Sequence, residues 1–372
     1  MTKAIKPPHQ SVSTVELFFD LVFVFMVTQL THLVEHAHGW SDFALAASIL
    51  VLLWWLYSGW LWLVSTLGVG LQLRVVLIVS MAGFLAMATA LPRMETDGIK
   101  LFAMAYLAVV LLHSAAFIQF GRTAHVKAIA IMAPFNFGAA AFVLGAAWMD
   151  AQWRMPLLVM GAIGLLAASA LPRPHGFTLQ AGHFSERHGL VILIAFGEAI
   201  IAIGSSAKDL PFDSRLAGVC TLGMLLIVGL WWRYFSGDDE AARHRLEAAS
   251  TAHREQLGAV YWQTHLVLIA GVVLISAGIK SVVAQTGTDM EAGVLLSVGT
   301  AFFLAGHGIF RVRLGLGRGS LAGWAAVVAL LCIPLAIESG RVVSLGALIL
   351  MLFGLIAADA WTTDPRRVVS TR

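Results

Sequence analysis

The sequence predicts an all-α membrane protein with about twelve transmembrane helices. Of its 372 residues, 59% are hydrophobic and only 12% are charged, and the mean hydropathy is +0.84. Soluble domains are about a quarter charged, so a soluble fold could not bury this much apolar surface. The apolar residues also fall into successive runs of about 20, the length that a helix needs to cross the hydrocarbon core. The chain is therefore predicted to cross the membrane many times.

Prolines and charged residues separate the apolar runs, as they do at Leu91-Pro92-Arg93. The first run lacks a small-residue cleavage site, so we interpret it as a retained span and not as a signal peptide. The hydrophilic stretch 237–256 predicts a solvated cytoplasmic connector, although it is long enough for an amphipathic surface helix. In chain order, the predicted spans are 15–34, 42–64, 73–91, 99–119, 127–147, 155–171, 184–206, 215–235, 257–281, 291–311, 321–337 and 342–361.

The distribution of positive charge predicts the orientation of the chain. Of the 24 lysines and arginines, 17 fall on the side that holds the N-terminus and 7 on the other side. Cytoplasmic loops carry the excess of positive charge, which places both termini in the cytoplasm. Residues 1–14 and 363–372 are then cytoplasmic tails. The small net charge of +3 gives no indication of nucleic-acid binding.

The second half of the chain repeats features of the first half in the same order. Leu53–Gly59 is similar to Leu230–Gly237, His113 corresponds to His307, and Glu16 corresponds to Glu186. The matches lie six spans apart, an even number, so both halves would enter the membrane from the same side. This predicts two parallel six-helix repeats, 15–173 and 174–362. Transport proteins built in this way usually place their substrate route between the halves.

Two carboxylates four residues apart open the first span. Glu16 completes a Ser-x-x-Glu capping box with Ser13, which is a structural explanation for it, and a chemical role stays open beside that explanation. Asp20 lies one turn deeper, where no cap explains it. Acids inside the membrane pair with a cation or line a hydrated cavity, so we predict that Asp20 belongs to an ion or substrate pathway.

The seventh span carries three further charged residues. Glu186 and Arg187 lie at its start, where we expect them to form a polar network with Glu16. Glu198 lies about 18 Å further along the helix axis. An acid at that depth can bind a cation or carry a proton, and a hydrogen-bonded structural acid is the alternative. Gly197 beside it would allow a close helix approach.

Histidines give weaker indications. His113 and His307 occupy corresponding spans and are interpreted either as members of a proton pathway or as hydrogen-bonded packing residues. His32 and His36 have the i, i+4 spacing of metal ligands, but no cysteine or second histidine pair completes a site. We therefore expect a wet outer rim there and no metal. Cys220 and Cys332 lack metal-ligand spacing as well, and no cofactor is predicted.

Two stretches resemble a known family. Val15–Val34 (VELFFDLVFVFMVTQLTHLV) and Phe184–Ile201 (FSERHGLVILIAFGEAII) resemble the most recognisable segments of the bacterial low temperature requirement A family. The resemblance implies a polytopic protein of the bacterial inner membrane over nearly the whole chain. Because the family is named for a growth phenotype in the cold, it implies little chemistry. A fainter similarity to two-repeat lysosomal potassium channels rests on Phe18-Phe19-Asp20, and the second half departs from it at Gly189-Leu190.

The leading functional hypothesis is a transporter or channel-like protein for a small ion or solute, with proton coupling as one form of it. Membrane acids and the duplication support this hypothesis. An intramembrane enzyme that acts on lipid is an alternative, but the chain lacks the common nucleotide-binding, hydrolase and metalloprotease motifs, so no catalytic residue is assigned. A membrane sensor or assembly factor is a third candidate. Membrane lipid and a small ion or solute are the expected partners, and a homo-oligomer stays open.

Overall fold

The computed structural model describes residues 12–68, 70–171, 179–317 and 319–363, and within these ranges it is helical and contains no strand. Twelve of the described helices are long and apolar enough to span a membrane, which confirms the predicted class of a multi-pass helical membrane protein. Each of the twelve predicted spans overlaps one of these helices. Their lengths follow from the apolar runs, because an uninterrupted helix satisfies its own backbone polar groups in lipid.

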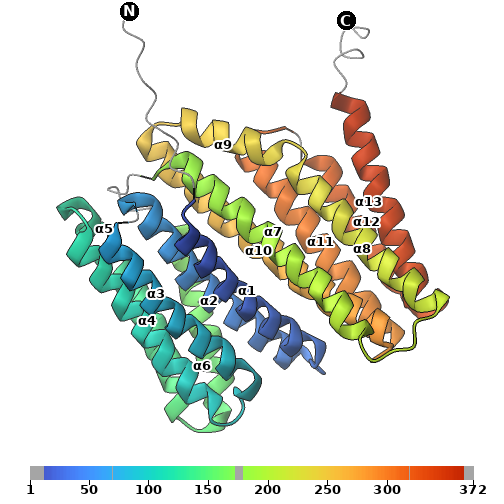
Figure 1. Ribbon diagram of the computed structural model, residues 1–372, viewed down its shortest axis with the longest axis horizontal. Coiled ribbons are helices and arrows are strands. Elements are labelled where there is room, and N and C mark those ends of the chain that lie inside the picture. Colours follow the sequence, from blue (N-terminus) through green and yellow to red (C-terminus); the bar gives the residue numbers. More distant parts are fainter. Residues whose placement is uncertain (1–11, 69, 172–178, 318, 364–372) are drawn as a thin grey trace, which may run out of the picture.

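The helices follow one another with short connections (Figure 1). The first half contains α1 (Thr14–Glu35), α2 (Trp40–Leu67), α3 (Leu71–Ala90), the 3₁₀ turn η1 (Leu91–Arg93), α4 (Gly98–Phe120), α5 (Thr123–Trp148) and α6 (Ala151–Ala170). The second half contains α7 (Ala181–Ala207), α8 (Ser214–Phe235), α9 (Asp238–Ala248), α10 (Thr251–Ala284), α11 (Asp289–Arg313), α12 (Ser320–Ser339) and α13 (Arg341–Thr363).

Helix α9 lies within the hydrophilic stretch 237–256, so the amphipathic-helix alternative describes part of that segment. Ala242 and Leu246 are buried, and α9 packs against α7 and α8. It lies at the end of the bundle where α1 begins and α13 ends (Figure 1), which we call the terminal end. The other end, where α1 finishes at Glu35, is called the opposite end.

The two halves share a pattern of helix packing. In the first half α1 packs against α3 and α2 packs against α6; in the second half α7 packs against α10 and α8 packs against α13. In span order these are the same pairs, first with third and second with sixth. The pattern supports the predicted duplication, which stays a prediction. The predicted boundary at 173/174 lies outside the described residues, as do most of the predicted tails 1–14 and 363–372.

Four helices form the junction between the halves. α1 and α2 from the first half pack against α7 and α10 from the second half. α2 and α10 are the most deeply buried of the four, whereas the peripheral helices expose large apolar side chains such as Ile78 and Leu331. An apolar exterior suits a lipid surround. The junction is therefore the place where polar side chains of the two halves can meet away from lipid.

Glycines set the closest helix approach in the second half. A Cβ on Gly271 of α10 would lie 2.7 Å from the Gly299 carbonyl oxygen of α11, and a Cβ on Gly299 would lie 2.8 Å from the Gly271 carbonyl oxygen. The two backbones therefore touch directly. Around Gly197 there is nothing within 4 Å of a Cβ. Within the described residues, no helix makes use of the close approach that Gly197 would allow.

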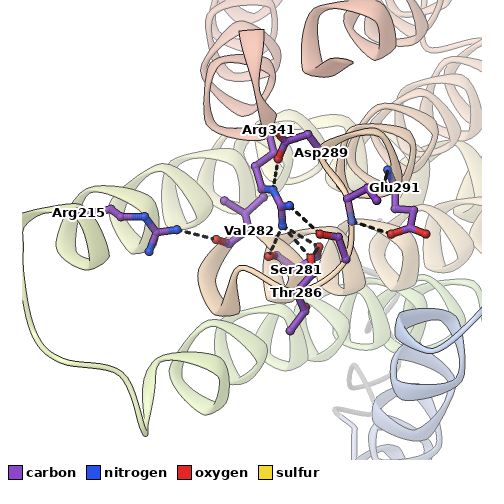
Figure 2. A network of polar contacts seen from close by, with 9 residues as sticks. Arg215, Ser281, Val282, Thr286, Asp289, Glu291 and Arg341 are labelled. Carbon is purple, nitrogen blue, oxygen red and sulfur yellow. Dashed lines mark hydrogen bonds and ion pairs between the residues drawn. The ribbon is translucent and has the colours of Figure 1, made fainter. Parts of the chain in front are cut away.

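A polar network fixes the helix ends at the opposite end of the second half (Figure 2). Arg341, the first residue of α13, donates to the carbonyl oxygens of Ser281 (3.0 Å), Thr286 (2.7 Å) and Gly287 (2.9 Å) and forms an ion pair with Asp289. These carbonyls belong to the end of α10 and the turn after it, where a helix leaves acceptors unsatisfied. One guanidinium thus joins α10, α11 and α13.

Candidate functional site

A buried group of charged residues lies between α1 and α7. It consists of Glu16 and Asp20 from α1 with His183 and Arg187 from α7, and we call it the α1–α7 charge cluster. Glu16, Asp20 and Arg187 are at most 2% exposed. Ionised groups in such surroundings are stable only when they are paired. The cluster lies near the terminal end, where both helices begin.

The helix geometry explains why these four residues meet. Glu16 and Asp20 are separated by four residues, and so are His183 and Arg187, so each pair lies on one face of its helix. α1 and α7 lie side by side and both begin at the terminal end (Figure 1). Two acids on one helix therefore face two nitrogen bases on the other.

Glu16 makes contacts both within the helix cap and within the charge cluster. Its Oε2 atom accepts hydrogen bonds from the Ser13 backbone N–H at 2.9 Å and from the Ser13 hydroxyl at 2.6 Å, which holds the start of α1. Its Oε1 atom lies 2.7 Å from His183 Nε2 and 3.1 Å from Arg187 Nη1. Glu16 thus connects the helix cap to the charge cluster.

Asp20 is paired through only one of its two oxygens. Its Oδ1 atom forms an ion pair with Arg187 and accepts a hydrogen bond from the Tyr57 hydroxyl of α2 at 2.5 Å. Its Oδ2 atom is buried without a hydrogen-bond partner within the described part of the chain. Of the two alternatives that the sequence leaves, a cation from another helix or a hydrated cavity, the structure places the cation, Arg187, at Asp20.

The cluster contains more acid than permanent base. Two carboxylates share the single guanidinium of Arg187, and His183 adds positive charge only when it is protonated. His183 also contacts the Ser65 hydroxyl of α2 at 3.1 Å, which leaves its other nitrogen directed at Glu16. Electrical neutrality at this site therefore requires a proton, on His183 or on one of the carboxylates, or a bound cation.

Glu186 does not join these residues. Its side chain is exposed, whereas Arg187 beside it is buried. Adjacent residues on a helix point about 100° apart, so only one of the two can face α1. Of the expected network of Glu16, Glu186 and Arg187, the structure brings Glu16 and Arg187 together.

Glu198 lies further along the same pair of helices. It is 3% exposed, and its Oε2 atom accepts a hydrogen bond from the Thr28 hydroxyl of α1 at 2.6 Å. Thr28 is eight residues beyond Asp20, about 12 Å along α1. His188 follows Arg187 directly and is buried. The other buried residues of α1 and α7 between these two levels are apolar: Phe23, Met26, Val27, Val191, Ile192, Ala195 and Phe196. The two acids thus share one helix interface at separate depths.

His113 and His307 lie in different halves and have different surroundings. His113 of α4 packs edge-on against Trp60 and Phe117 and lines a pocket between α2, α4, α5 and α10. His307 of α11 is fully buried, with Nε2 3.1 Å from Asp238 Oδ2 at the start of α9. The two histidines therefore occupy corresponding spans but have different contacts.

The sequence did not single out a group of aromatic and imidazole rings at the terminal end. His265 Nε2 lies 2.7 Å from the Tyr234 hydroxyl, and His265 Nδ1 lies 2.9 Å from the Tyr261 carbonyl oxygen, so the carbonyl selects a proton on Nδ1 and the hydroxyl donates to Nε2. The centroids of the His188 and His265 rings lie 4.9 Å apart, with the rings edge-on. Because His188 follows Arg187 on α7, these rings adjoin the charge cluster.

One cluster residue that the sequence analysis did not select carried a signal that spacing could have revealed. His183 precedes Arg187 by four residues and so matches the Glu16–Asp20 spacing. Tyr57, by contrast, belongs to the aromatic Leu53–Gly59 segment, where nothing distinguishes it from its apolar neighbours. Its role depends on which face of α2 turns toward α1.

Comparisons with known proteins place the chain in a family. The model of the family described as bacterial low temperature requirement A protein (LtrA) matches residues 11–357. A protein of Rhizobium meliloti (strain 1021), described as uncharacterized, is 28% identical over 313 residues, which covers 78% of this chain and 75% of that protein. No solved structure matches. Since the match takes in both α1 and α7 and nearly all of the spanning helices, the chain belongs to the bacterial low temperature requirement A family.

Proposed function

We propose that this protein moves a small ion or solute across the membrane and couples that movement to a proton carried by Asp20. The α1–α7 charge cluster is the observation that carries the proposal. Buried acids in membrane helices are costly and mark ion pathways by default. Here the buried acids are paired with Arg187 at the junction between the halves. Transporters of this general architecture have their substrate routes at that junction.

The unequal charge of the cluster supports the choice of Asp20. A proton on Asp20 would neutralise the carboxylate and weaken its ion pair with Arg187, while Glu16 keeps its own contacts with Arg187, His183 and Ser13. The Oδ2 atom, which has no hydrogen-bond partner among the described residues, offers a position for that proton. Arg187 would then pair with two carboxylates when Asp20 is ionised and with Glu16 alone when Asp20 is protonated. Such a local change of charge can alter how α1 and α7 pack.

Glu198 is the second acid of the proposed route, about 12 Å deeper on the same interface. Beyond His188, the buried side chains of α1 and α7 that separate the two levels are apolar, so passage between them needs relative movement of α1 and α7. Such movement of one half against the other is how transporters with related halves alternate their access. We also propose that the protein lies in the inner membrane with its terminal end facing the cytoplasm. The 17 to 7 distribution of basic residues supports this orientation.

Flux measurements test this proposal. Purified protein in liposomes, with a pH-sensitive dye inside, is subjected in turn to gradients of H⁺, K⁺ and Na⁺, and protein-free liposomes give the background. Asp20→Asn preserves the size of the side chain and removes its charge. Glu338→Gln is the matched control, because Glu338 is an exposed acid at the end of α12.

We expect proton flux above background for the unchanged protein and for Glu338→Gln, with at least a tenfold loss for Asp20→Asn. Unaltered flux in Asp20→Asn would remove Asp20 from the route. Liposomes that behave like protein-free ones under every gradient would contradict the transport proposal itself.

A further inference from the structure

A second cluster of ligand-type side chains lies at the opposite end of α1. His32 and Glu35 lie in its last turn and His36 is the C-cap residue, and one ligand atom from each lies within 4.8 Å of the others. The two histidine rings stack with centroids 4.3 Å apart. The sequence spacing supplies two imidazoles; the structure adds a carboxylate beside them.

Hydrogen bonding prepares one of the histidines to bind a metal. His36 Nδ1 lies 2.9 Å from the His32 carbonyl oxygen, which selects a proton on Nδ1 and leaves the lone pair on Nε2. Metal-binding histidines are usually oriented in this way, with the second ring nitrogen donating to a carbonyl or carboxylate. Both histidines are exposed, so an ion can reach them from the aqueous side.

Glu35 connects this cluster to the other half of the protein. Its Oε2 atom lies 2.5 Å from Lys280 Nζ near the end of α10, and both side chains are less than one-fifth exposed. This ion pair links α1 to α10 at the opposite end. A cation that binds the Glu35 carboxylate would compete with the ammonium group for it.

We propose that His32, Glu35 and His36 bind a divalent transition metal, with Zn²⁺ as the best match. Two imidazole nitrogens and one carboxylate oxygen form the three-ligand set that leaves a fourth tetrahedral position open to water. Binding draws Glu35 away from Lys280 and so loosens the link between the halves at this end. The inference rests on contacts away from the α1–α7 charge cluster and is independent of the proposed transport function.

The test is calorimetric titration of ZnCl₂ into the full-length protein in detergent, purified without a polyhistidine tag and stripped of metal. We expect one equivalent of zinc to bind. His32→Gln and His36→Gln should each weaken binding at least tenfold, because each removes a ligand. Lys280→Met should strengthen binding, because it removes the group that competes for Glu35. His38→Gln, an exposed histidine two residues beyond the cluster, is the control and should bind as the unchanged protein does.

The opposite signs expected for the histidine and lysine variants separate this site from general loss of structure. Equal zinc affinity in the unchanged protein, His32→Gln and His36→Gln would overturn the site. Absence of zinc binding in the unchanged protein would overturn it as well. Zinc affinity that is unaltered or lowered in Lys280→Met would contradict the competition for Glu35.

Discussion

At the scale of single residues, Glu16 and Asp20 share a guanidinium but differ in what else surrounds them. Glu16 lies in the first turn of α1, where backbone N–H groups and the helix dipole favour a negative charge. Asp20 is one turn deeper and relies on Arg187 and Tyr57. A change at Tyr57 should therefore act on the protein mainly through Asp20, whereas a change at Arg187 should act on both acids.

Removal of the shared cation tests the pairing. Arg187→Gln leaves two buried carboxylates without their guanidinium, and we expect it to lower the free energy of unfolding by about 3–5 kcal/mol. Adding Asp20→Asn to this variant removes one of the two stranded charges and should restore part of the loss. Unfolding in detergent, followed by circular dichroism, measures both. A double variant less stable than Arg187→Gln would contradict the pairing.

The hydrogen bond from Tyr57 gives a second residue-scale prediction. Tyr57→Phe removes a donor to an ionised carboxylate, which should cost about 1.5–3 kcal/mol. Tyr106→Phe is the matched control, since the Tyr106 side chain is equally buried but its hydroxyl has no hydrogen-bond partner within the described residues. The thermal unfolding midpoint should fall further in Tyr57→Phe than in Tyr106→Phe. Equal midpoints would count against the hydrogen bond from Tyr57 to Asp20.

Sequence reasoning could predict that Asp20 needs a partner but could not name all of its partners. The need follows from burial of a charge in an apolar helix, which is a local property. The partners depend on which faces of α2 and α7 turn toward α1. Arg187 was expected near Glu16. Its contact with Asp20 joins residues 167 positions apart in the chain, and the contact between Tyr57 and Asp20 joins residues 37 positions apart, so both depend on tertiary packing.

At the scale of helices, two kinds of interface hold the bundle together. α1 and α7 meet through matched polar side chains one turn apart, whereas α10 and α11 meet through the backbones at Gly271 and Gly299. Close packing of small residues is the main source of helix association where lipid is as apolar as the side chains. The second interface should therefore be sensitive to even one added methyl group.

Substitution of glycine by alanine tests this sensitivity. Gly299→Ala places a Cβ within 2.8 Å of the Gly271 carbonyl oxygen, and we expect it to destabilise the protein by about 1–3 kcal/mol. Gly204→Ala in α7 is the control, because its Cβ meets nothing within 4 Å and alanine favours helix by about 1 kcal/mol. Thermal unfolding in detergent should order the variants in this way. The reverse order would contradict the close approach.

Helix positions were predictable because hydropathy depends on local sequence. All twelve predicted spans overlap helices of the structure, and the ends differ by a few residues. Close approaches were not predictable in the same way, as Gly197 demonstrates. A glycine permits contact, but the opposite helix decides whether contact occurs, and around Gly197 no atom approaches.

At the scale of the whole molecule, the two halves meet along α1, α2, α7 and α10. The Glu16–Arg187 and Asp20–Arg187 ion pairs join them near the terminal end, and the Glu35–Lys280 ion pair joins them at the opposite end. The corresponding packing within each half supports, as a proposal, two repeats that move against each other. In that account, Asp20 and Glu198 belong to one route at the moving interface.

Flux in liposomes through Asp20→Asn, Glu198→Gln and the double variant tests that claim most directly. If both acids act on one proton-coupled route, each single variant should lose at least tenfold in flux, and the double variant should be no slower than the slower single variant, since residues that act as a unit are not additive. Equal amounts of folded protein must be inserted, as measured by size-exclusion profiles before reconstitution. Full flux in either single variant, or a double variant that loses the product of the two effects, would contradict the shared route.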